Sequence, residues 1–552
     1  MIALDFVNIA AHLPAMARDR PHALAVVCPA GRDRVGRPRH THWTFRQLDR
    51  ESDALARGLT SVGIGRGARA VLMVKPSLEF FALTFALFKA GAVPVLIDPG
   101  LGIRHLGPCL AEAAPEAFIG IPRAQVARRV LGWSRATIKT VVTVGPRCPG
   151  GGSTLDDVRR AGQADAPFEV ARTGPDEVAA ILFTSGSTGV PKGAVYTHAV
   201  FAAQVEMLRG LYAIEPGEID LCTFPLFALF APALGMTSVI PEMDATRPAR
   251  VDPSKIFEAI EDFGVTNLFG SPALIRRVGT YGAARGLTLP TLRRAISAGA
   301  PVSARVLETF ATMLDPNARI FTPYGATEAL PVASIADDEI LGETRHATDR
   351  GAGVCVGRPV EGVRVAIIRI SDAPIPEWSD DLLVPDGEVG EIAVQGPIAT
   401  REYFRRPEAT ALAKIADPAH GSFYHRMGDL GSRDDRGRIW FHGRKAHRVV
   451  TPSGTLFTIP CEAVFNTHPA VFRTALVGVG PPGAMRPVLC VELAGPADRD
   501  QVRRELLELG KSFEHTRGIE TILFHPAFPV DIRHNAKIFR EELAVWAARA
   551  LR

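Results

Sequence analysis

Hydroxyl, glycine and lysine residues are concentrated in residues 181–195, which read ILFTSGSTGVPKGAV. The apolar residues 178–183 have the length and composition of a buried strand, and the glycines after them let the backbone come close to a ligand. Consecutive backbone N–H groups in such a loop form an anion-binding concavity, to which a lysine adds a mobile positive charge. The stretch therefore predicts a polyphosphate site. Its candidate binding residues are Thr184, Ser185, Gly186, Ser187, Thr188, Gly189 and Lys192.

The loop differs from a Walker A sequence, because Pro191 and Gly193 occupy the places where that pattern requires Gly before the lysine and Ser or Thr after it. A Ser- and Gly-rich surface loop would have a similar composition. The string TSGSTGVPKG nevertheless resembles the signature loop of the adenylate-forming superfamily: acyl-CoA synthetases, luciferase-like enzymes and peptide-synthetase adenylation domains. This resemblance implies that the loop binds ATP.

A second motif, YGATE at residues 324–328, follows an apolar segment that is predicted to be a strand. A carboxylate at the carboxyl end of a parallel strand can hold a magnesium ion that bridges ATP phosphates, although a solvated glutamate in a turn is the simpler alternative. In the superfamily, the resemblance places Tyr324 near the adenine, with Gly325 beside it. It also implies that Thr327 contacts the α-phosphate and that Glu328 binds Mg²⁺.

Two further motifs suggest contacts to a nucleoside. The string SAGAP at residues 297–301 resembles the superfamily's adenine-edge turn, with Gly299 and Ala300 as the expected contacts, but alone it is a weak signal. An aspartate that accepts hydrogen bonds from vicinal ribose hydroxyls is a recurrent way to hold a nucleoside. The resemblance assigns that contact to Asp429, with Arg444 as the second ribose contact.

Lys537 lies near the end of the chain, where a lysine is usually solvated. The surrounding string RHNAKIFR resembles the superfamily's C-terminal motif, whose lysine bridges the substrate carboxylate and the α-phosphate. The expected catalytic residues are therefore Lys537, Glu328, Thr327 and Lys192. The implied reaction joins a carboxylate to ATP and gives an acyl-adenylate and pyrophosphate.

The elements that must position these residues alternate between helices and strands. Residues 43–62 and 80–90 have helical apolar spacing, and residues 68–74 and 93–97 read as strands. Such alternation predicts an α/β fold with parallel sheets flanked by helices. Residues 362–394 add strand patterns that are typical of a β-rich lobe.

A short basic passage near residue 444 divides the chain. We expect a large N-terminal adenylation domain over residues 1–443, a hinge at 444–447, and a small mobile α+β lid domain over 448–552 that carries Lys537. The superfamily rotates this small domain between its half-reactions.

Composition excludes several other classes of protein. The 552 residues are 47% hydrophobic with a net charge of +4, which gives no reason to expect a nucleic-acid partner. The 7 cysteines are scattered without CxxC spacing, which favours a reducing, cytoplasmic location over a disulfide framework or a zinc ribbon. No secretory signal is evident at the N-terminus.

The apolar residues 221–241 are long enough to span a bilayer, but Pro225, Pro232 and Gly235 interrupt them, so we expect no transmembrane span. We predict instead that this segment lines an acyl pocket, although a plain core helix would look the same. The candidate pocket residues are Phe227, Ala228, Leu229 and Phe230.

The chain departs from the superfamily's pattern at three positions. Ala228 lies where an aromatic residue or histidine is common, Ala446 replaces the usual hinge Asp or Lys, and Ala536 replaces the Gly before the C-terminal lysine. Ala228 and Ala446 argue against an ordinary second half-reaction with coenzyme A.

Taken together, the motifs are most similar to those of the olefin-biosynthesis β-lactone synthetases. That resemblance implies a long-chain 2-alkyl-3-hydroxy acid as substrate, whose own hydroxyl displaces AMP to close the lactone. It also implies a dehydrogenase and an α/β-hydrolase-like β-lactone decarboxylase as pathway partners. One alternative is a long-chain fatty acyl-CoA synthetase. A remote one is a non-catalytic acyl- or nucleotide-binding protein, which would have no evident use for Lys537.

Overall fold

A computed structural model describes residues 7–97, 101–184, 191–530 and 538–552. Most of the predicted phosphate loop, Ser185 to Gly189, and the predicted catalytic Lys537 therefore lie outside the described residues. Of Thr184 only the backbone is described.

A seven-stranded sheet in the N-terminal half ends at the predicted phosphate loop. Its pairs are parallel except for the last, in which β8 and β9 run antiparallel on either side of that loop. Helices α2 (Phe45–Ser61) and α3 (Leu78–Lys89) fall where the sequence predicted helices. In order across the sheet, the strands are β7 (Ser153–Thr154), β6 (Thr140–Thr143), β5 (Ala117–Gly120), β3 (Arg69–Met73), β4 (Val93–Ile97), β8 (Val178–Thr184) and β9 (Lys192–Thr197).

A second, fourteen-stranded sheet has a parallel half and an antiparallel half. The parallel half consists of β11 (Thr237–Val239), β10 (Ile219–Cys222), β12 (Asn267–Gly270), β13 (Arg294–Ser297) and β14 (Arg319–Ala326), with β1 (Leu24–Arg32) beside β11. Strand β14 then pairs antiparallel with β15 (Ala329–Ala336), so the turn between them carries Thr327 and Glu328.

The predicted β-rich lobe is present, and it continues this same sheet instead of forming a separate one. Its strands follow β15 in the order β16 (Val354–Pro359), β21 (Ile439–Arg444), β20 (Ser422–Arg433), β18 (Gly390–Gln395) and β17 (Arg364–Ile368). All of these pairs are antiparallel. Strand β20 carries Asp429 directly opposite Arg444 of β21.

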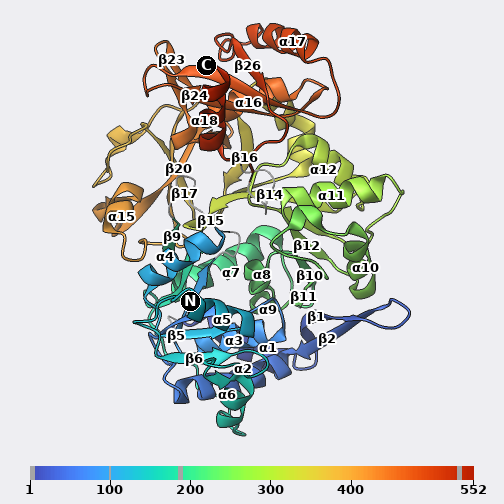
Figure 1. The fold of residues 1–552 in the computed structure, drawn as a ribbon, viewed down its shortest axis with the longest axis vertical. Coiled ribbons are helices and arrows are strands. Elements are labelled where there is room, and N and C mark those ends of the chain that lie inside the picture. The colour runs from blue at the N-terminus through green and yellow to red at the C-terminus, as the bar shows by residue number, and fades with distance from the viewer. Residues whose placement is uncertain (1–6, 98–100, 185–190, 531–537) are drawn as a thin grey trace.

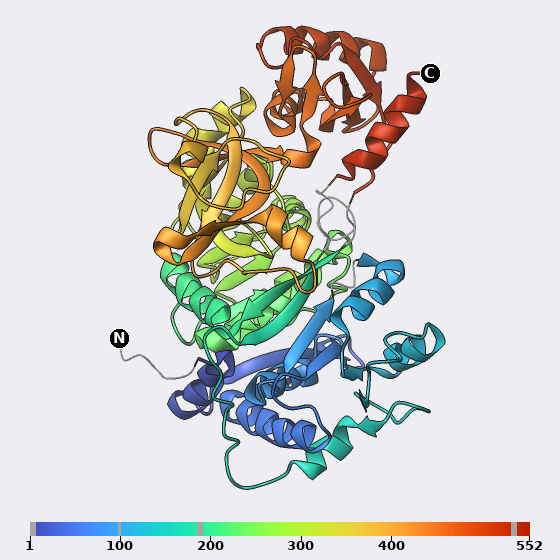
Figure 2. The same cartoon turned by 90° about the vertical axis from the view of Figure 1, so that its left-hand side faces the viewer.

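The C-terminal part of the chain forms its own small sheet and core. Strands β24 (Val471–Val479), β25 (Arg486–Leu493) and β26 (Thr521–Phe524) pack with α16 (Thr458–Asn466), α17 (Arg499–Lys511) and α18 (Arg540–Ala550). In Figures 1 and 2 this part, coloured orange to red, lies at one end of the molecule, far from the blue N-terminal elements. A short 3-10 helix, Lys445–His447, connects it to β21. The boundary at 444–447 and the mobility of the small domain stay predictions.

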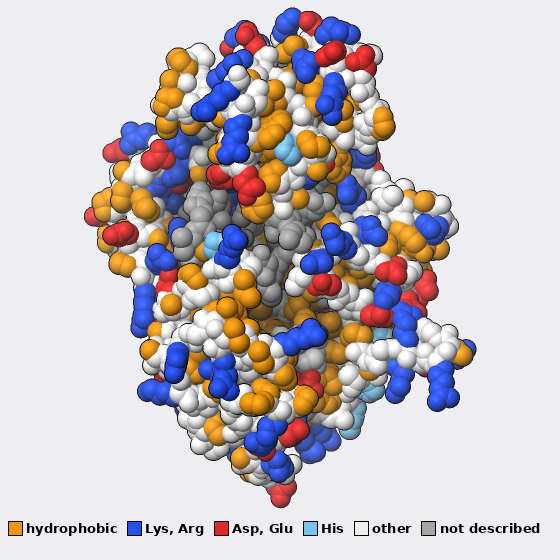
Figure 3. Space-filling view, in the orientation of Figure 1, with side chains coloured by type: hydrophobic (Ala, Val, Ile, Leu, Met, Phe, Trp, Pro, Cys, Tyr) orange, Lys and Arg blue, Asp and Glu red, His pale blue; other side chains and the backbone are white. Residues whose placement is uncertain are grey.

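The apolar segment 221–241 folds into short pieces because its prolines and glycine break it. It forms the end of β10, helices α8 (Pro225–Ala228) and α9 (Phe230–Leu234), and the whole of β11. Across the described ranges, no helix is both long and apolar enough to cross a membrane. On the face seen in Figure 3, the described acidic and basic side chains are interspersed and form no broad patch of one sign.

Candidate active site

A cavity of about 620 Å³ lies where the large sheet, α7 (His198–Tyr212) and α8–α9 meet, and its size is typical of small-molecule sites. One end of the cavity is polar and the other is apolar. It brings together ten of the predicted site residues: Lys192, Phe227, Leu229, Phe230, Gly299, Tyr324, Gly325, Thr327, Glu328 and Arg444. Residues far apart in the sequence therefore converge on one site.

Glu328 is held in position by two neighbours. The hydroxyl of Tyr403 donates a hydrogen bond to Oε1 over 2.7 Å, and the backbone N–H of Thr400 donates to the carbonyl oxygen of Glu328 over 2.8 Å. The ammonium of Lys192 lies 4.9 Å from the centroid of the Tyr403 ring, a cation–π distance. Tyr403 thus links the candidate metal ligand to the candidate phosphate-binding lysine.

The donor set at Glu328 fits a magnesium ion that is held jointly with phosphates. Carboxylate oxygen is a hard ligand, and Mg²⁺ in nucleotide sites is usually bound by one or two carboxylates plus phosphate oxygens and water. Among the described residues, Oε2 of Glu328 receives no hydrogen bond, and no cluster of three or more His, Cys, Asp or Glu side chains forms a closed metal cage. The geometry therefore suits a metal that arrives with a nucleotide.

Asp429, Tyr324 and Arg444 form a compact polar group at the same end. The Tyr324 hydroxyl donates to Oδ2 of Asp429 over 2.7 Å, and Nη1 of Arg444 lies 2.9 Å from Oδ1. Burial raises the pKa of Asp429, while Arg444 and Tyr324 oppose that shift. Asp429 itself is buried behind its two partners and does not line the cavity, whereas Tyr324 and Arg444 do. The role of Asp429 as a ribose contact stays a prediction.

Buried cationic and neutral nitrogens surround this polar end. Burial lowers the pKa of Lys414 to about 7, and its ammonium donates to the carbonyl oxygen of Thr400 beside Glu328. Burial, together with the positive charges of Lys414 and Lys192, lowers the pKa of His425 well below its usual range. His425 donates from Nδ1 to the carbonyl of Ala413 over 3.2 Å, which leaves Nε2 as the acceptor of a neutral ring.

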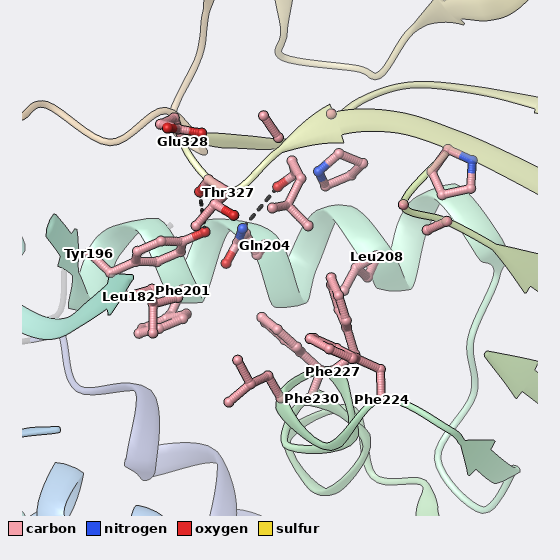
Figure 4. Close-up of a pocket in the computed structure, with 18 of the residues that line it drawn as sticks. Leu182, Tyr196, Phe201, Gln204, Leu208, Phe224, Phe227, Phe230, Thr327 and Glu328 are labelled. Atoms are coloured by element: carbon pink, nitrogen blue, oxygen red, sulfur yellow. Dashed lines mark hydrogen bonds between the residues drawn. The ribbon is translucent and has the colours of Figure 1, made fainter. Parts of the chain in front are cut away.

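The apolar end is walled by aromatic rings that we call the aromatic wall: Phe201, Phe224, Phe227, Phe230 and Phe269. Neighbouring ring centroids lie 4.6 Å apart for Phe227 and Phe269, and 6.2 Å apart for Phe201 and Phe230. Figure 4 shows Phe224, Phe227 and Phe230 below the turn that carries Thr327. Apolar side chains continue the cavity beyond the wall, including Phe85, Phe88, Leu234 and Met236.

Two other predicted contacts lie away from the cavity. Ala228 is fully buried in the main hydrophobic core and does not line the cavity. The short helix α8 points Ala228 into that core and its neighbour Phe227 toward the cavity. Ala300 is half-buried beside Gly299, but only Gly299 reaches the cavity.

Asp220 and Asn267 form a polar pair that lines the otherwise apolar part of the cavity. They are paired neighbours on β10 and β12, and the amide Nδ2 of Asn267 donates to Oδ1 of Asp220 over 2.5 Å. Both residues are buried. Burial raises the pKa of Asp220 from 3.8 to about 7. At neutral pH this carboxyl group is therefore partly protonated.

We predict that Asp220→Asn makes the protein relatively more stable at alkaline pH. The folded pKa of Asp220 lies above its unfolded value, so its contribution to stability is full below pH 4 and is lost as the pH rises to 7. Asparagine keeps the shape and the acceptor for Asn267 but does not titrate. Between pH 5 and pH 8, the free energy of unfolding of the wild type should fall by about 2.5 kcal/mol relative to the variant.

Urea unfolding at pH 5 and pH 8, followed by circular dichroism, measures this difference. The exposed Asp435 offers a matched control, because Asp435→Asn should leave the pH dependence unchanged. Parallel pH profiles for the wild type and Asp220→Asn would show that Asp220 is ionised throughout.

Tyr403 and Gln204 are among the cavity residues that the sequence analysis did not identify. Tyr403 lies in a loop with no motif around it, so nothing in the sequence identifies it as a partner of Glu328. Gln204 had a usable signal: it is the polar member of a stripe on α7 in which Phe201, Leu208 and Tyr212 recur at helical spacing. All four of these residues line the cavity.

Comparison with known proteins agrees with this geometry. Residues 13–404 match the family model described as AMP-binding enzyme. The olefin beta-lactone synthetase of Xanthomonas campestris pv. campestris is 54% identical over 549 residues, covering 98% of each chain. The protein of the same name from Stenotrophomonas maltophilia is 54% identical over 551 residues, covering 99% of this chain and 98% of its own.

The fold is also shared with solved structures. The amide bond synthetase McbA from Marinactinospora thermotolerans superposes with a TM-score of 0.79 at 23% identity, covering 98% of this chain and 99% of its own. Since the sequence match covers most of the chain and the closely similar relatives match it almost end to end, the chain belongs to the AMP-binding enzyme family, the adenylate-forming superfamily, in its olefin β-lactone synthetase branch.

Proposed function

We propose that this protein uses ATP to activate a long-chain 2-alkyl-3-hydroxy acid as an acyl-adenylate and then closes it to a β-lactone, releasing AMP. The observation that carries the proposal is the 54% identity, over nearly the full length, to two proteins named olefin beta-lactone synthetase. A cavity of about 620 Å³ that has both polar and apolar walls supports it.

In the first half-reaction, the substrate carboxylate attacks the α-phosphorus and pyrophosphate leaves. We assign Lys192 and the loop from Thr184 to Gly189 to the phosphates, Thr327 to the α-phosphate, and Gly299, Tyr324, Asp429 and Arg444 to the nucleoside. Lys537 is assigned to the two anions that meet at the reacting phosphorus. A cation fixed there stabilises the charge that builds up in the transition state.

Mg²⁺ would be held by Glu328 and would neutralise charge on the ATP phosphates when bound. Tyr403 orients the carboxylate by its hydrogen bond to Oε1, and Oε2 would then be available to bind the metal. This division of the two oxygens is the chain's own contribution to metal binding.

In the second half-reaction, the 3-hydroxyl oxygen bonds to the acyl carbon while the bond from that carbon to the AMP oxygen breaks. The hydroxyl proton leaves on the phosphate of AMP, so the atoms and charges balance. An internal nucleophile has a high effective molarity, and no pocket for a second substrate is needed. The apolar end of the cavity suits the alkyl chains, since each buried methylene contributes about 0.8 kcal/mol.

We also propose that residues 448–552 rotate about 444–447 between the half-reactions. The connecting segment contacts both parts of the chain. The ammonium of Lys445 lies 3.0 Å from Glu391 of β18 in the large sheet, and Nε2 of His447 lies 3.1 Å from Glu541 of α18 in the C-terminal part. During the rotation each of these contacts would either break or move together with the small domain. A dehydrogenase that supplies the hydroxy acid and an α/β-hydrolase-like decarboxylase that consumes the lactone are the pathway partners we propose.

Product analysis tests the function directly. The purified protein is incubated with magnesium-ATP and a synthetic 2-alkyl-3-hydroxy acid, with and without coenzyme A, and the products are identified by NMR and mass spectrometry. We expect AMP and a product lighter than the acid by one water, in equal yield with or without coenzyme A. A thioester that forms only with coenzyme A would place the protein among long-chain fatty acyl-CoA synthetases instead.

A further inference from the structure

Gln204 is a buried amide in the cavity whose oxygen has no partner among the described residues. Its side chain is only 2% exposed and lines the cavity between the polar end and the aromatic wall. No group in the part of the chain that the structure describes donates a hydrogen bond to Oε1. Buried polar atoms without partners are uncommon and destabilise the folded protein. We therefore infer that this oxygen accepts a hydrogen bond from a bound ligand.

The orientation of the amide is fixed by its other half. The carbonyl oxygen of Leu330 lies 2.9 Å from Nε2, and only the nitrogen can donate to it. Turning the amide over would place two oxygens against each other. The oxygen therefore lies on the side of the amide away from Leu330, and Figure 4 shows the Gln204 side chain above Phe227 and Phe230.

The described side chains around this oxygen offer no ready donor. The hydroxyl of Tyr196 has no proton left to donate to Oε1 of Gln204, because it donates to the backbone carbonyl of Thr327. The other neighbours labelled in Figure 4 include Thr327, which makes no hydrogen bond to this oxygen, and the apolar Phe201 and Leu208. An anion would be repelled by the amide oxygen, so the matching ligand group is a neutral donor in an apolar setting.

Gln204 contacts the segment of the chain beside which the reacting carboxyl carbon is proposed to lie. Gln204 and Tyr196 both hold the segment 327–330, which carries Thr327 and Glu328. The side chain that carries the unpartnered oxygen thus contacts the segment at which the α-phosphate is proposed to bind, and it lines the same cavity. In a 3-hydroxy acid the hydroxyl is the only donor near the carboxyl carbon.

We propose that Gln204 selects the substrate by accepting a hydrogen bond from its 3-hydroxyl group, an inference that rests on the proposed function. A hydroxyl that donates its proton to Oε1 keeps its oxygen lone pairs free to face the acyl carbon. Gln204 takes no proton and forms no covalent bond; it acts as a specificity and positioning residue. An acid that lacks the hydroxyl leaves the amide oxygen unpaired and is bound less well.

The test compares a 2-alkyl-3-hydroxy acid with the same acid lacking the hydroxyl. Adenylation of each is followed by pyrophosphate release, and kcat/KM is determined for both. We expect the wild type to favour the hydroxy acid at least tenfold. In Gln204→Met, which keeps the length of the side chain but removes its acceptor, this ratio should fall to within about twofold.

The ratio separates recognition from a structural effect. Gln204→Met also removes the donor to Leu330, but that loss affects both acids alike and cancels. Tyr212→Phe is a matched control on the same helix: it removes the hydroxyl of a cavity-lining residue, which makes a long, weak hydrogen bond of 3.4 Å with Oγ of Ser334. This variant should keep the wild-type ratio.

Wild-type protein that adenylates both acids equally, or a Gln204→Met variant that keeps the wild-type ratio, would overturn the inference. The wild-type comparison tests the inference even if the variant does not fold. Product analysis of the hydroxy-acid reactions tests lactone formation separately, because pyrophosphate release reports adenylation whether or not a lactone follows.

Discussion

Replacing Lys537 with alanine should lower the rate of pyrophosphate release by about 10²–10³-fold while leaving ATP affinity nearly unchanged. Attack of a carboxylate on the α-phosphorus brings two anions together, and Lys537 is assigned to the position between them. Such a cation acts mainly in the transition state, so its loss should appear in kcat more than in ATP binding. Pyrophosphate release and equilibrium binding of ATP measure the two quantities.

Lys511 provides a control within the same C-terminal part of the chain. It lies on α17, is exposed to solvent and pairs with Glu508 one turn away. Lys511→Ala should therefore keep wild-type turnover. Undiminished pyrophosphate release in Lys537→Ala would remove Lys537 from the catalytic machinery and would leave the resemblance of its motif without a function.

The elements of the fold were predictable from sequence where the apolar pattern was periodic. The strand at residues 93–97 appears as β4 with the predicted ends. The strand at 68–74 and the helix at 43–62 appear as β3 and α2 with ends shifted by one or two residues. The continuity of the large sheet was not predictable, since the pairing of β16 with β21 joins segments far apart in the sequence. Local patterns specify a strand but not its distant neighbour.

For the candidate site, motif residues were easier to predict than their surroundings. Lys192, Tyr324 and Glu328 lie in recognisable strings, and the structure places all three around one cavity. Tyr403 has no such string, and its contact with Glu328 exists only after folding. Ala228 lies in a recognisable string, but the sequence does not show which way its side chain points. The four-residue helix α8 determines which of the adjacent residues Phe227 and Ala228 faces the cavity.

Replacing Glu328 with glutamine should raise the magnesium concentration needed for half-maximal activity by about tenfold or more and lower the maximal rate. Glutamine has nearly the same size and can still accept the hydrogen bond from Tyr403, so the turn between β14 and β15 should keep its shape. The change removes the negative charge that the metal requires. A magnesium titration of pyrophosphate release at saturating ATP measures it, and an unchanged titration would mean that the metal is held elsewhere.

Tyr403→Phe separates charge from orientation at the same site. The phenyl ring preserves the surface beneath the Lys192 ammonium, which lies 4.9 Å from the ring centroid, but it removes the 2.7 Å hydrogen bond to Oε1. The carboxylate keeps its charge and loses only its positioning partner. We therefore expect a smaller increase in the magnesium requirement than in Glu328→Gln. If both variants behave alike, the orientation of Glu328 matters as much as its charge, because Mg²⁺ demands near-ideal ligand geometry.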